Sequence, residues 1–580
     1  MNQNFYPAPR ARECTDLRSL VSDAARRSPD HPYLVYKRAG ATESLSFEGF
    51  RERLFALGEA FFEMNLAGGA VAVLGETSPE WILSYLATVS SGGVVVPLDK
   101  ELAREEIFNF INKVGCRAVV YSKKYKRYFE EEAVCPSVKF FIEFGTTEQE
   151  MVPDSAQVRP GKVNFLDVLA LGRDAVAARK RRFKNFEIDL DKVCAVIFTS
   201  GTTGTSKGVM LSQRNLVSGI NSSYNMTEFT EQDTIVSVLP IHHTYEMTCG
   251  ILTPLLIGCT VCVNDSLKYV LKNFQLYKPT GLVLVPLFVS TIYKKIWETA
   301  KKSHRAGLLK GSIAVSDVLR KIKVDPRKML FKSVRDAFGG RLVRIICGGA
   351  PMPAEYVKEF DAFGIALCQG YGITECAPLI SVCPENANRP GSCGLPVPGL
   401  EVWIDKAPGE EFGEIVVKGD CVMKGYYEDP EATEAVLQDG WFRTGDYGYQ
   451  DADGYLYITG RKKNVIVLNN GKNVFPEEIE EYLEKIELIA ECAVVGRQDA
   501  DGNVAVTALI YPDFARAAEK GLGNDLKAIG EEIKKEIALL NRTLPAFKQI
   551  RGIEMRRTEF EKTTTKKIKR YTIQQSEQEK

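Results

Sequence analysis

Apolar and polar positions along the chain follow two rhythms, one typical of helices and one typical of buried strands. Between residues 47 and 64, Phe50, Leu54, Leu57 and Phe61 recur at the spacing of one helix face. Short runs rich in Val and Ile predict strands between such helices. In chain order we expect helix 47–64, strand 70–74, helix 80–91, strand 93–97, helix 104–114 and strand 118–121. Strands that alternate with helices are typical of a parallel sheet covered on both faces.

The later part of the chain continues this pattern and then changes character. Further strands are expected at 193–198, 234–240, 342–346 and 413–419. The stretch 133–184 has little pattern and is expected to be connecting structure, whereas a helix is expected within 210–220. From residue 462 onward, we expect a helix opened by Pro476, strands 492–496 and 504–511, helix 525–540 and strand 550–555.

The length and this order of elements predict two domains. With 580 residues the chain is too long for a single hydrophobic core. We expect an α/β fold in which residues 1–461 form parallel-rich sheets with helices and a β-rich subdomain. Residues 462–580 are expected to form a small α+β C-terminal domain.

Composition excludes some classes of function and leaves others open. Lys+Arg and Asp+Glu are both 75, so net charge gives no global drive toward nucleic acid or an anionic membrane. No apolar leader opens the chain and no apolar run is long enough for a bilayer, so we expect a soluble, cytoplasmic protein. The 14 cysteines fit no metal or disulfide spacing and are expected to be reduced thiols in the core.

One loop carries the strongest chemical signal. Residues 199–209 read T-S-G-T-T-G-T-S-K-G-V and follow the expected strand 193–198. Glycines let backbone N–H groups approach an anion, hydroxyls add donors, and Lys207 adds a positive charge, so the loop suits a phosphate. It lacks the G-K-[ST] ending of the P-loop, and composition alone would also suit a solvated turn.

The order of these residues resembles the phosphate-loop signature of the adenylate-forming enzymes. This family includes acyl-CoA synthetases, luciferases and the adenylation domains of peptide synthetases. Further family motifs follow in the same order, so the resemblance extends from Leu45 to Arg570. In this loop, the resemblance implies contacts to ATP by Thr199, Ser200, Gly201, Thr202, Thr203, Gly204 and Lys207, with a catalytic role for Thr199.

A second motif, L-C-Q-G-Y-G-I-T-E-C-A-P at 367–378, follows small residues at the end of another expected strand. The resemblance implies that Tyr371 stacks on adenine, Thr374 contacts phosphate, and Glu375 binds Mg²⁺ and acts in catalysis. A carboxylate is the oxygen ligand that Mg²⁺ prefers, usually together with substrate phosphates. Other nucleotide contacts implied here are Gly349, Ala350, Pro351, Gln369, Gly370 and Gly372.

Further site residues are implied nearer the domain boundary. The family's ribose-binding Asp matches Asp446, with Ile458 and Arg461 as further nucleotide contacts. A Pro-x-x-His turn that borders the acyl pocket in the family matches His243, although a buried structural pair with His242 is the alternative from composition alone.

The C-terminal domain is implied to be mobile. Its hinge matches Lys463, and its catalytic lysine matches Lys567, with Lys566 where the family usually has Gly. In the family, rotation of this domain exchanges the lysine-bearing face for a thiol channel between two half-reactions.

The implied activity is that of a long-chain fatty acid–CoA ligase, which uses ATP, Mg²⁺ and coenzyme A. A fatty carboxylate would form acyl-AMP and pyrophosphate, and the thiol of coenzyme A would then displace AMP. Leu239-Pro240-x-x-His243-Thr244-Tyr245-Glu246 and Asn470-Gly471-Lys472-Asn473 favour this subtype. The alternatives are transfer to an acyl carrier protein, an aryl acid as substrate, or a degenerate nucleotide-binding scaffold.

A basic stretch at 300–332 stands outside these motifs. It contains ten Lys and Arg residues against Asp317 and Asp325. Such a run is usually a solvated helix face, and contact with a membrane surface is the alternative that a fatty substrate favours.

Overall fold

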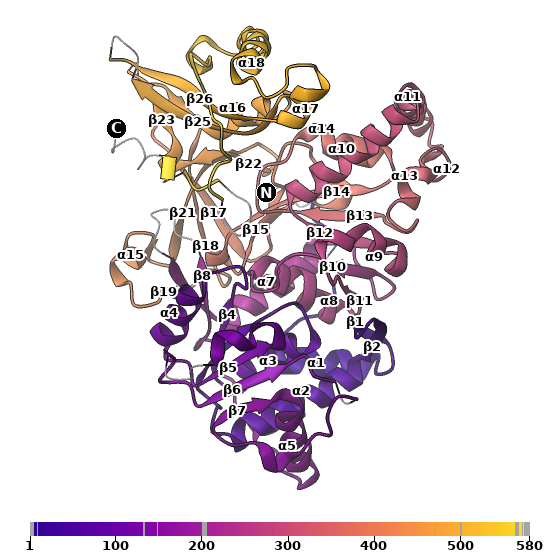
Figure 1. Ribbon diagram of the computed structural model, residues 1–580, viewed down its shortest axis with the longest axis vertical. Coiled ribbons are helices and arrows are strands. Elements are labelled where there is room, and N and C mark those ends of the chain that lie inside the picture. The colour runs from indigo at the N-terminus through magenta and orange to yellow at the C-terminus, as the bar shows by residue number, and fades with distance from the viewer. Residues whose placement is uncertain are drawn as a thin grey trace.

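The structure, a computed structural model, describes residues 5–8, 10–130, 134–147, 149–199, 206–469, 471–498, 502–562, 568–570 and 572–573. Two large sheets and a β-rich sheet build the N-terminal part, and a separate small sheet with its helices builds the C-terminal part (Figure 1).

The first sheet has eight strands in the order β19-β9-β8-β4-β3-β5-β6-β7. These are β3 (Ala70–Leu74), β4 (Val94–Leu98), β5 (Ala118–Ser122), β6 (Phe140–Phe144), β7 (Gly161–Asn164), β8 (Val193–Thr199), β9 (Lys207–Ser212) and β19 (Gly425–Tyr426). Strands β3 to β7 are parallel, whereas β9 runs antiparallel to β8. Alternate side chains of β3 enter different cores, Val71 and Val73 on one face and Ala72 and Leu74 on the other.

Helices cover both faces of this sheet. They are α2 (Phe47–Glu63), α3 (Pro79–Ser90), α4 (Arg104–Val114), α5 (Phe165–Ala177) and the short α6 (Arg182–Asn185). Ile107 and Ile111 of α4 lie in the core of one face, while α2, α3 and α5 contribute to the core of the other. Helices α2 and α5 approach so closely that a Cβ at Gly172 would lie 1.8 Å from the carbonyl oxygen of Ala56.

The second sheet has nine strands in the order β16-β15-β14-β13-β12-β10-β11-β1-β2. These are β1 (Pro32–Arg38), β2 (Ala41–Ser46), β10 (Thr234–Ser237), β11 (Thr260–Val263), β12 (Gly281–Leu284), β13 (Arg344–Cys347), β14 (Ala366–Gly372), β15 (Leu379–Val382) and β16 (Leu395–Pro396). Strands β1 and β10 to β14 are parallel along this order, and antiparallel strands close both edges.

Nine α-helices and a π-helix accompany the second sheet within the described residues. They are α1 (Leu17–Arg27), α7 (Gln213–Met226), the π-helix Glu246–Leu252, α8 (Thr253–Ile257), α9 (Val270–Tyr277), α10 (Pro286–Lys302), α11 (Ala306–Lys321), α12 (Arg327–Leu330), α13 (Lys332–Asp336) and α14 (Ala354–Ala362). Their apolar side chains share one continuous core with the first sheet, so the two large sheets form a single packed body.

The β-rich part and the C-terminal part complete the fold. The β-rich sheet contains β17 (Leu400–Asp405), β18 (Gly413–Gly419), β20 (Leu437–Gln438), β21 (Trp441–Gln450) and β22 (Leu456–Arg461), with α15 (Pro430–Glu434) beside it. The C-terminal part contains β23 (Ile466–Val467), β24 (Asn473–Val474), α16 (Pro476–Leu483), β25 (Ile489–Gln498), β26 (Val504–Pro512), α17 (Phe514–Glu519), α18 (Leu526–Asn541) and β27 (Gly552–Met555). Its apolar residues form a separate core.

The expected fold class is confirmed, and two local expectations are wrong. The stretch 133–184 contains β6, β7 and α5, which extend and cover the first sheet. Residues 207–212 form β9 because they pair with both β8 and β19, so α7 begins only at Gln213. The phosphate-type loop therefore joins two antiparallel strands. The division at 461/462 stays a prediction.

Candidate active site

Strands β8 and β9, which flank the phosphate-type sequence, pair with each other in antiparallel fashion. Thr199 and Lys207 are paired across the two strands and mark the ends of the loop. The Thr199 hydroxyl donates to the Lys207 carbonyl oxygen at 3.5 Å, and the Ser206 hydroxyl donates to Oε1 of Glu106 at 3.3 Å. The predicted contacts Ser200, Gly201, Thr202, Thr203 and Gly204 lie outside the described residues.

Next to this hairpin, one tyrosine joins a carboxylate to a cation. The Tyr426 hydroxyl donates to Oε1 of Glu375 at 2.9 Å, and Nζ of Lys207 lies 4.7 Å from the centre of the Tyr426 ring. Strand β19 pairs with β9, which places Tyr426 beside Lys207. Burial, together with the negative charge of Glu375, raises the pKa of Tyr426, so its phenol stays protonated and donates.

Glu375 is held in place by backbone on two sides. It lies in the turn Thr374–Cys376 directly after β14, and its carbonyl oxygen accepts from the Met423 N–H at 2.8 Å. A Cβ at Gly372 would lie 2.0 Å from the Pro378 carbonyl oxygen, so only glycine allows this turn to fold back onto β15. The second glycine of the Gly-Tyr-Gly sequence is thus explained by packing.

A second group of polar side chains surrounds Asp446. Tyr371 donates to Oδ2 of Asp446 at 2.6 Å, and Nε of Arg461 lies 2.8 Å from Oδ1. Asp446 and Arg461 lie opposite each other because they are paired across the neighbouring strands β21 and β22. Although burial acts to lower it, the pKa of Arg461 is raised because Asp446, Tyr371 and Glu375 lie nearby. The two groups therefore belong to one site.

The remaining predicted contacts take different positions around this site. Gly349, Ala350 and Pro351 form an exposed turn after β13, with Gly349 at a φ of +94°. Gln369 is buried in β14, where its amide donates to Sγ of Cys393 at 3.6 Å. Gly370 of β14, Thr374 after it and Ile458 of β22 are each partly buried.

The two histidines lie where the two large sheets meet. His242 and His243 follow β10, their ring centres are 4.1 Å apart, and Nε2 of His242 lies 3.5 Å from Oδ2 of Asp99, which follows β4. Burial and then the neighbouring positive charges of His243 and Lys100 lower the pKa of His242 well below its usual value. His242 is therefore neutral at pH 7 and lies between the two sheets, while His243 is the less buried of the two.

The segment around Lys463 is anchored on either side to different parts of the molecule. Nζ of Lys462 donates to Oε2 of Glu414 in β18 at 2.9 Å. The amide of Asn464 donates to Oε1 of Glu477 in α16 at 2.6 Å. Lys463 thus lies between an anchor to the β-rich part and an anchor to the C-terminal part. Lys567, like Lys566, lies outside the described residues.

The cysteines are all buried and free, as the sequence predicts. In the part of the chain that the structure describes, no three His, Cys, Asp or Glu side chains are grouped so that they could hold a metal ion.

Comparison with known proteins decides the family. A profile of the AMP-binding enzyme family matches residues 21–427, and a profile of the AMP-binding enzyme C-terminal domain matches residues 463–580. The chain belongs to the AMP-binding enzyme family. The resemblance to adenylate-forming enzymes, and to long-chain ligases among them, is thereby confirmed.

Known relatives of this AMP-binding enzyme span most of its length. It is 29% identical to long chain acyl-CoA synthetase 6, peroxisomal, of Arabidopsis thaliana, over 94% of this chain and 78% of that protein. It is 26% identical to the chloroplastic long-chain-fatty-acid–[acyl-carrier-protein] ligase AEE15 of the same plant, over 84% of this chain and 76% of that protein. The crystal structure of ATP-bound MatB from Rhodopseudomonas palustris superposes with a TM-score of 0.72 at 26% identity, covering 97% and 99% of the two chains.

Sequence reasoning missed Tyr426 and Asp99. Tyr426 lies 51 positions from Glu375, and only the pairing of β19 with β9 brings the two together. Asp99 comes from a different sheet from His242. The doublet Tyr426-Tyr427 after Gly425 was the available signal, but aromatic doublets are common in strands.

Proposed function

We propose that this protein activates a long-chain fatty acid with ATP and transfers the acyl group to coenzyme A, giving acyl-CoA, AMP and pyrophosphate. The observation that carries the proposal is the meeting of Lys207 and Glu375 at Tyr426, beside the β8–β9 loop. A cation for phosphate and a carboxylate for Mg²⁺ are the two charges that binding of a metal–nucleotide complex requires.

The donor set of the site fits Mg²⁺ held jointly with a nucleotide. Mg²⁺ usually takes one or two carboxylates and completes its shell with phosphates and water. Glu375 offers a carboxylate whose orientation Tyr426 fixes. Bound there, Mg²⁺ would neutralise phosphate charge as pyrophosphate leaves.

The polar group around Asp446 suits the ribose and α-phosphate side of the nucleotide. We assign Asp446 to the ribose hydroxyls and Arg461 to ribose and phosphate, because a buried carboxylate can accept from two hydroxyls at once. Tyr371 orients Asp446 through its hydroxyl. The turn Gly349–Pro351 and residues Gln369, Gly370, Gly372, Thr374 and Ile458 are assigned to the nucleotide from the family motifs.

The reaction has two displacements. An oxygen of the fatty carboxylate attacks the α-phosphorus of ATP, and the bond to the leaving pyrophosphate breaks. The sulfur of coenzyme A then attacks the acyl carbonyl carbon, the thiol proton is lost, and AMP leaves. We assign stabilisation of the developing charge to Thr199, Lys207 and Lys567, and the border of the acyl pocket to His243.

The division into residues 1–461 and 462–580, with a hinge at Lys463, is part of this proposal. Support comes from the opposite anchoring of Lys462 and Asn464. Contacts between the two parts include the exposed ion pairs Arg516–Glu298 and Lys301–Glu487, the latter at 4.0 Å. Exposed pairs contribute only about 0–1 kcal/mol each, so they oppose rotation weakly.

The names of two relatives support a fatty substrate, since one is called a long chain acyl-CoA synthetase and the other a long-chain-fatty-acid ligase. Because the relative AEE15 is named as a ligase for an acyl carrier protein, such a carrier remains the alternative acceptor of the acyl group in this proposal. No helix in the described part of the chain has the length and apolar character needed to cross a membrane. Because long-chain acids partition into bilayers, the proposal includes peripheral contact with a membrane surface.

The proposal is tested by pyrophosphate release with a panel of acids, each assayed with coenzyme A, with a phosphopantetheine-bearing carrier protein, and with neither. We expect activity to rise with chain length, since each buried CH₂ adds about 0.8 kcal/mol until the pocket is full. Coenzyme A should yield a thioester. Faster turnover of acetate or benzoate than of any long-chain acid would contradict the substrate assignment. Thioester formation only on the carrier protein would contradict the acceptor.

A further inference from the structure

Helix α11 is apolar on two opposite faces. On its inner face, Leu309 and Ile313 pack against the main core and Ser316 is fully buried. The outer face carries Leu308, Val315, Val318 and, just past the helix, Ile322, which are between 51% and 68% exposed. Their spacing of seven, three and four positions is that of one continuous helix stripe. A helix with one covered face normally presents polar side chains on the other.

The exposed apolar surface continues beyond the helix. Val324 precedes α12 and is 50% exposed, and Met329 lies within α12 and is 75% exposed. Figure 1 shows α11 and α12 at the upper right edge of the molecule, away from the body of the two sheets. We call Leu308, Val315, Val318, Ile322, Val324 and Met329 the α11 surface.

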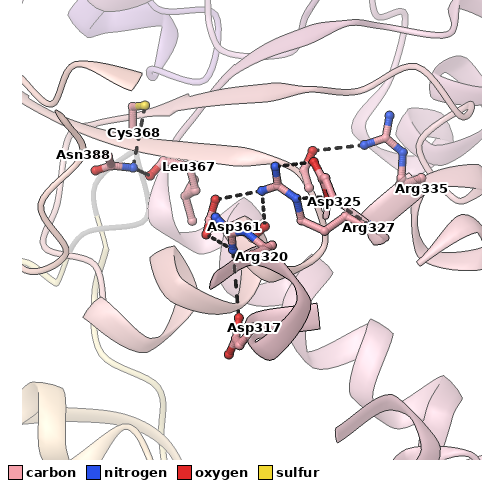
Figure 2. Close-up of polar contacts among 10 residues, drawn as sticks. Asp317, Arg320, Asp325, Arg327, Arg335, Asp361, Leu367, Cys368 and Asn388 are labelled. Atoms are coloured by element: carbon pink, nitrogen blue, oxygen red, sulfur yellow. Dashed lines mark hydrogen bonds and ion pairs between the residues drawn. The ribbon is translucent and has the colours of Figure 1, made fainter. Parts of the chain in front are cut away.

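Three arginines in or beside this basic region, Arg320, Arg327 and Arg335, are used inside the protein. Nη1 of Arg320 lies 2.7 Å from Oδ2 of Asp361, and Nη1 of Arg327 lies 3.1 Å from Oδ1 of the same residue. Arg327 also pairs with Asp325 at 2.8 Å, and Arg335 donates to the Gly364 carbonyl oxygen at 3.0 Å. Figure 2 shows Arg320 and Arg327 converging on Asp361 of α14. These contacts fix α11 and α12 to the body as a platform.

Four of the lysines in the same region are used differently. Lys302, Lys321, Lys323 and Lys328 are exposed, and no carboxylate among the described residues pairs with them. The α11 surface is therefore flanked by positive charges that have no internal role. A partner that fits must offer hydrocarbon to the stripe and negative charge to the lysines.

We infer that the α11 surface docks on an anionic lipid bilayer, with its aliphatic side chains entering the boundary between headgroups and acyl chains. α11 has 16 residues and is about 24 Å long at 1.5 Å per residue, enough to lie in the membrane plane. The fixed platform means that little ordering accompanies binding. This inference rests on the proposed function for its purpose, since a bilayer is where a long-chain acid is found.

A protein partner fits this surface less well. Protein interfaces concentrate their binding energy in Trp, Tyr and Arg side chains. The α11 surface contains only aliphatic side chains and one Met, and Arg320, Arg327 and Arg335 are tied to Asp361 and Gly364. Aliphatic side chains with flanking lysines are instead what helices that lie on anionic membranes present.

The test is co-sedimentation of the full chain with vesicles of phosphatidylcholine alone or mixed with phosphatidylglycerol, without nucleotide or acid. We expect binding to the anionic vesicles that weakens with salt. The double variant Lys321→Glu, Lys323→Glu should lose at least tenfold in partitioning, since each lysine contributes about fivefold. Val318→Asp with Ile322→Asp should lose at least about tenfold on either lipid.

Matched controls come from exposed residues elsewhere. Leu539→Asp on α18, whose side chain is 56% exposed, and Lys184→Glu should change partitioning by less than about twofold. Thermal melting should show that all variants are folded. The inference would be overturned if the wild type did not sediment with anionic vesicles, or if the control variants lost as much binding as the α11 variants. It would also be overturned if the α11 substitutions left vesicle binding unchanged but abolished either binding to a carrier protein or self-association of this chain.

This test separates the surface from the proposed function. Pyrophosphate release with octanoate, a water-soluble fatty acid, should be the same for the wild type and the α11 variants in the absence of vesicles. Vesicle binding without any acid-dependent pyrophosphate release would refute the proposed function and leave the surface standing. Normal pyrophosphate release without vesicle binding would refute the surface alone.

Discussion

The hydroxyl of Tyr426 donates a hydrogen bond of 2.9 Å to Oε1 of Glu375. Tyr426 reaches this position because β19 pairs with β9, the strand that begins at Lys207. The bond fixes the direction of the carboxylate and leaves Lys207 on the face of the same ring. One buried phenol thus sets the geometry of both charges that the proposed function assigns to a metal–nucleotide complex.

We predict that Glu375→Gln leaves the fold intact and removes most of the adenylation activity. The amide keeps the shape of the side chain and its contact with Tyr426 but loses the charge that binds a hard cation. Acid-dependent pyrophosphate release at limiting Mg²⁺ should fall by about 10²-fold or more. Higher Mg²⁺ should restore part of it, and near-normal activity at limiting Mg²⁺ would refute the assignment of Glu375.

We predict that Tyr426→Phe acts through Glu375 as a loss of positioning. Removing a partner that orients a metal ligand typically costs about 10–100-fold in metal affinity or activity. The concentration of Mg²⁺ needed for half-maximal adenylation should therefore rise, while thermal stability changes little. Tyr427→Phe is the matched control, because Tyr427 is held through its backbone N–H to Gly208. A Tyr426→Phe enzyme with the wild-type Mg²⁺ dependence would show that the hydrogen bond is structural only.

These two predictions also show where the sequence was sufficient. Strand 70–74, helix 104–114 and strand 413–419 have the predicted bounds, because each is a short apolar or periodic run that its neighbours simply bury. Pairing across strands is different, since it depends on segments far apart in the chain. Residues 210–212 were expected to belong to a helix within 210–220, and only the neighbouring β8 and β19 make them part of a strand.

A buried carboxyl group marks the start of the π-helix. Glu246 is fully buried, and the Ser237 hydroxyl donates to its Oε1. A Cβ at Gly250 would lie 2.7 Å from Cδ of Glu246, so glycine is needed to make room for the carboxyl group. Burial raises the pKa of Glu246 from 4.5 to about 8, with Ser237 acting in the opposite direction. The group is therefore protonated in the folded state at neutral pH.

We predict a stability loss that Glu246 causes as the pH rises. The pKa of Glu246 in the folded state lies above its value in the unfolded state. Its contribution to the free energy of unfolding is therefore fully present below about pH 4.5 and is lost as the pH rises through about 8. Glu246→Gln cannot ionise, so the variant should gain in melting temperature relative to the wild type between these values. The corresponding difference in the free energy of unfolding between the variant and the wild type is on the order of a few kcal/mol. Substitution of the exposed Glu536 by Gln should show no such trend. If the melting temperatures of Glu246→Gln and the wild type changed with pH in the same way, the prediction would be refuted.

We predict that Lys567→Ala separates the half-reactions. Removing one preorganised donor to transition-state charge commonly costs about 10²–10³ in rate, so adenylation should slow by at least that order. Thioester formation from synthetic acyl-AMP and coenzyme A should barely change, because the proposed rotation of the C-terminal domain would by then have removed Lys567 from the site. Lys463→Pro should give the reverse pattern, since a fixed φ obstructs the hinge.

Lys566→Ala is the internal control for the half-reaction experiment, and it should be mild. If Lys566→Ala cripples adenylation and Lys567→Ala does not, the assignment moves by one residue. If Lys567→Ala slows both half-reactions equally, the proposed rotation is wrong for this protein.

The sequence predicted individual residues of the candidate site better than it predicted which of them contact one another. Glu375, Asp446 and Arg461 come from local motifs; in the structure Arg461 pairs with Asp446 and Glu375 lies nearby, while their roles stay predictions. Tyr426 and Asp99 could not be found this way, because each reaches the site through strand pairing or from a different sheet. The stretch 133–184 was missed for a related reason: β6 and β7 are short edge strands whose identity depends on β5 beside them.

The central claim is that this protein activates a fatty carboxylate by adenylation. The most direct measurement is identification of the nucleotide products with a long-chain acid and ATP, first without coenzyme A and then with it. We predict acid-dependent exchange of labelled pyrophosphate into ATP and detectable acyl-AMP without coenzyme A. Its addition should give AMP, pyrophosphate and acyl-CoA in equal amounts. Formation of ADP and phosphate, or pyrophosphate exchange that does not depend on the acid, would contradict the account.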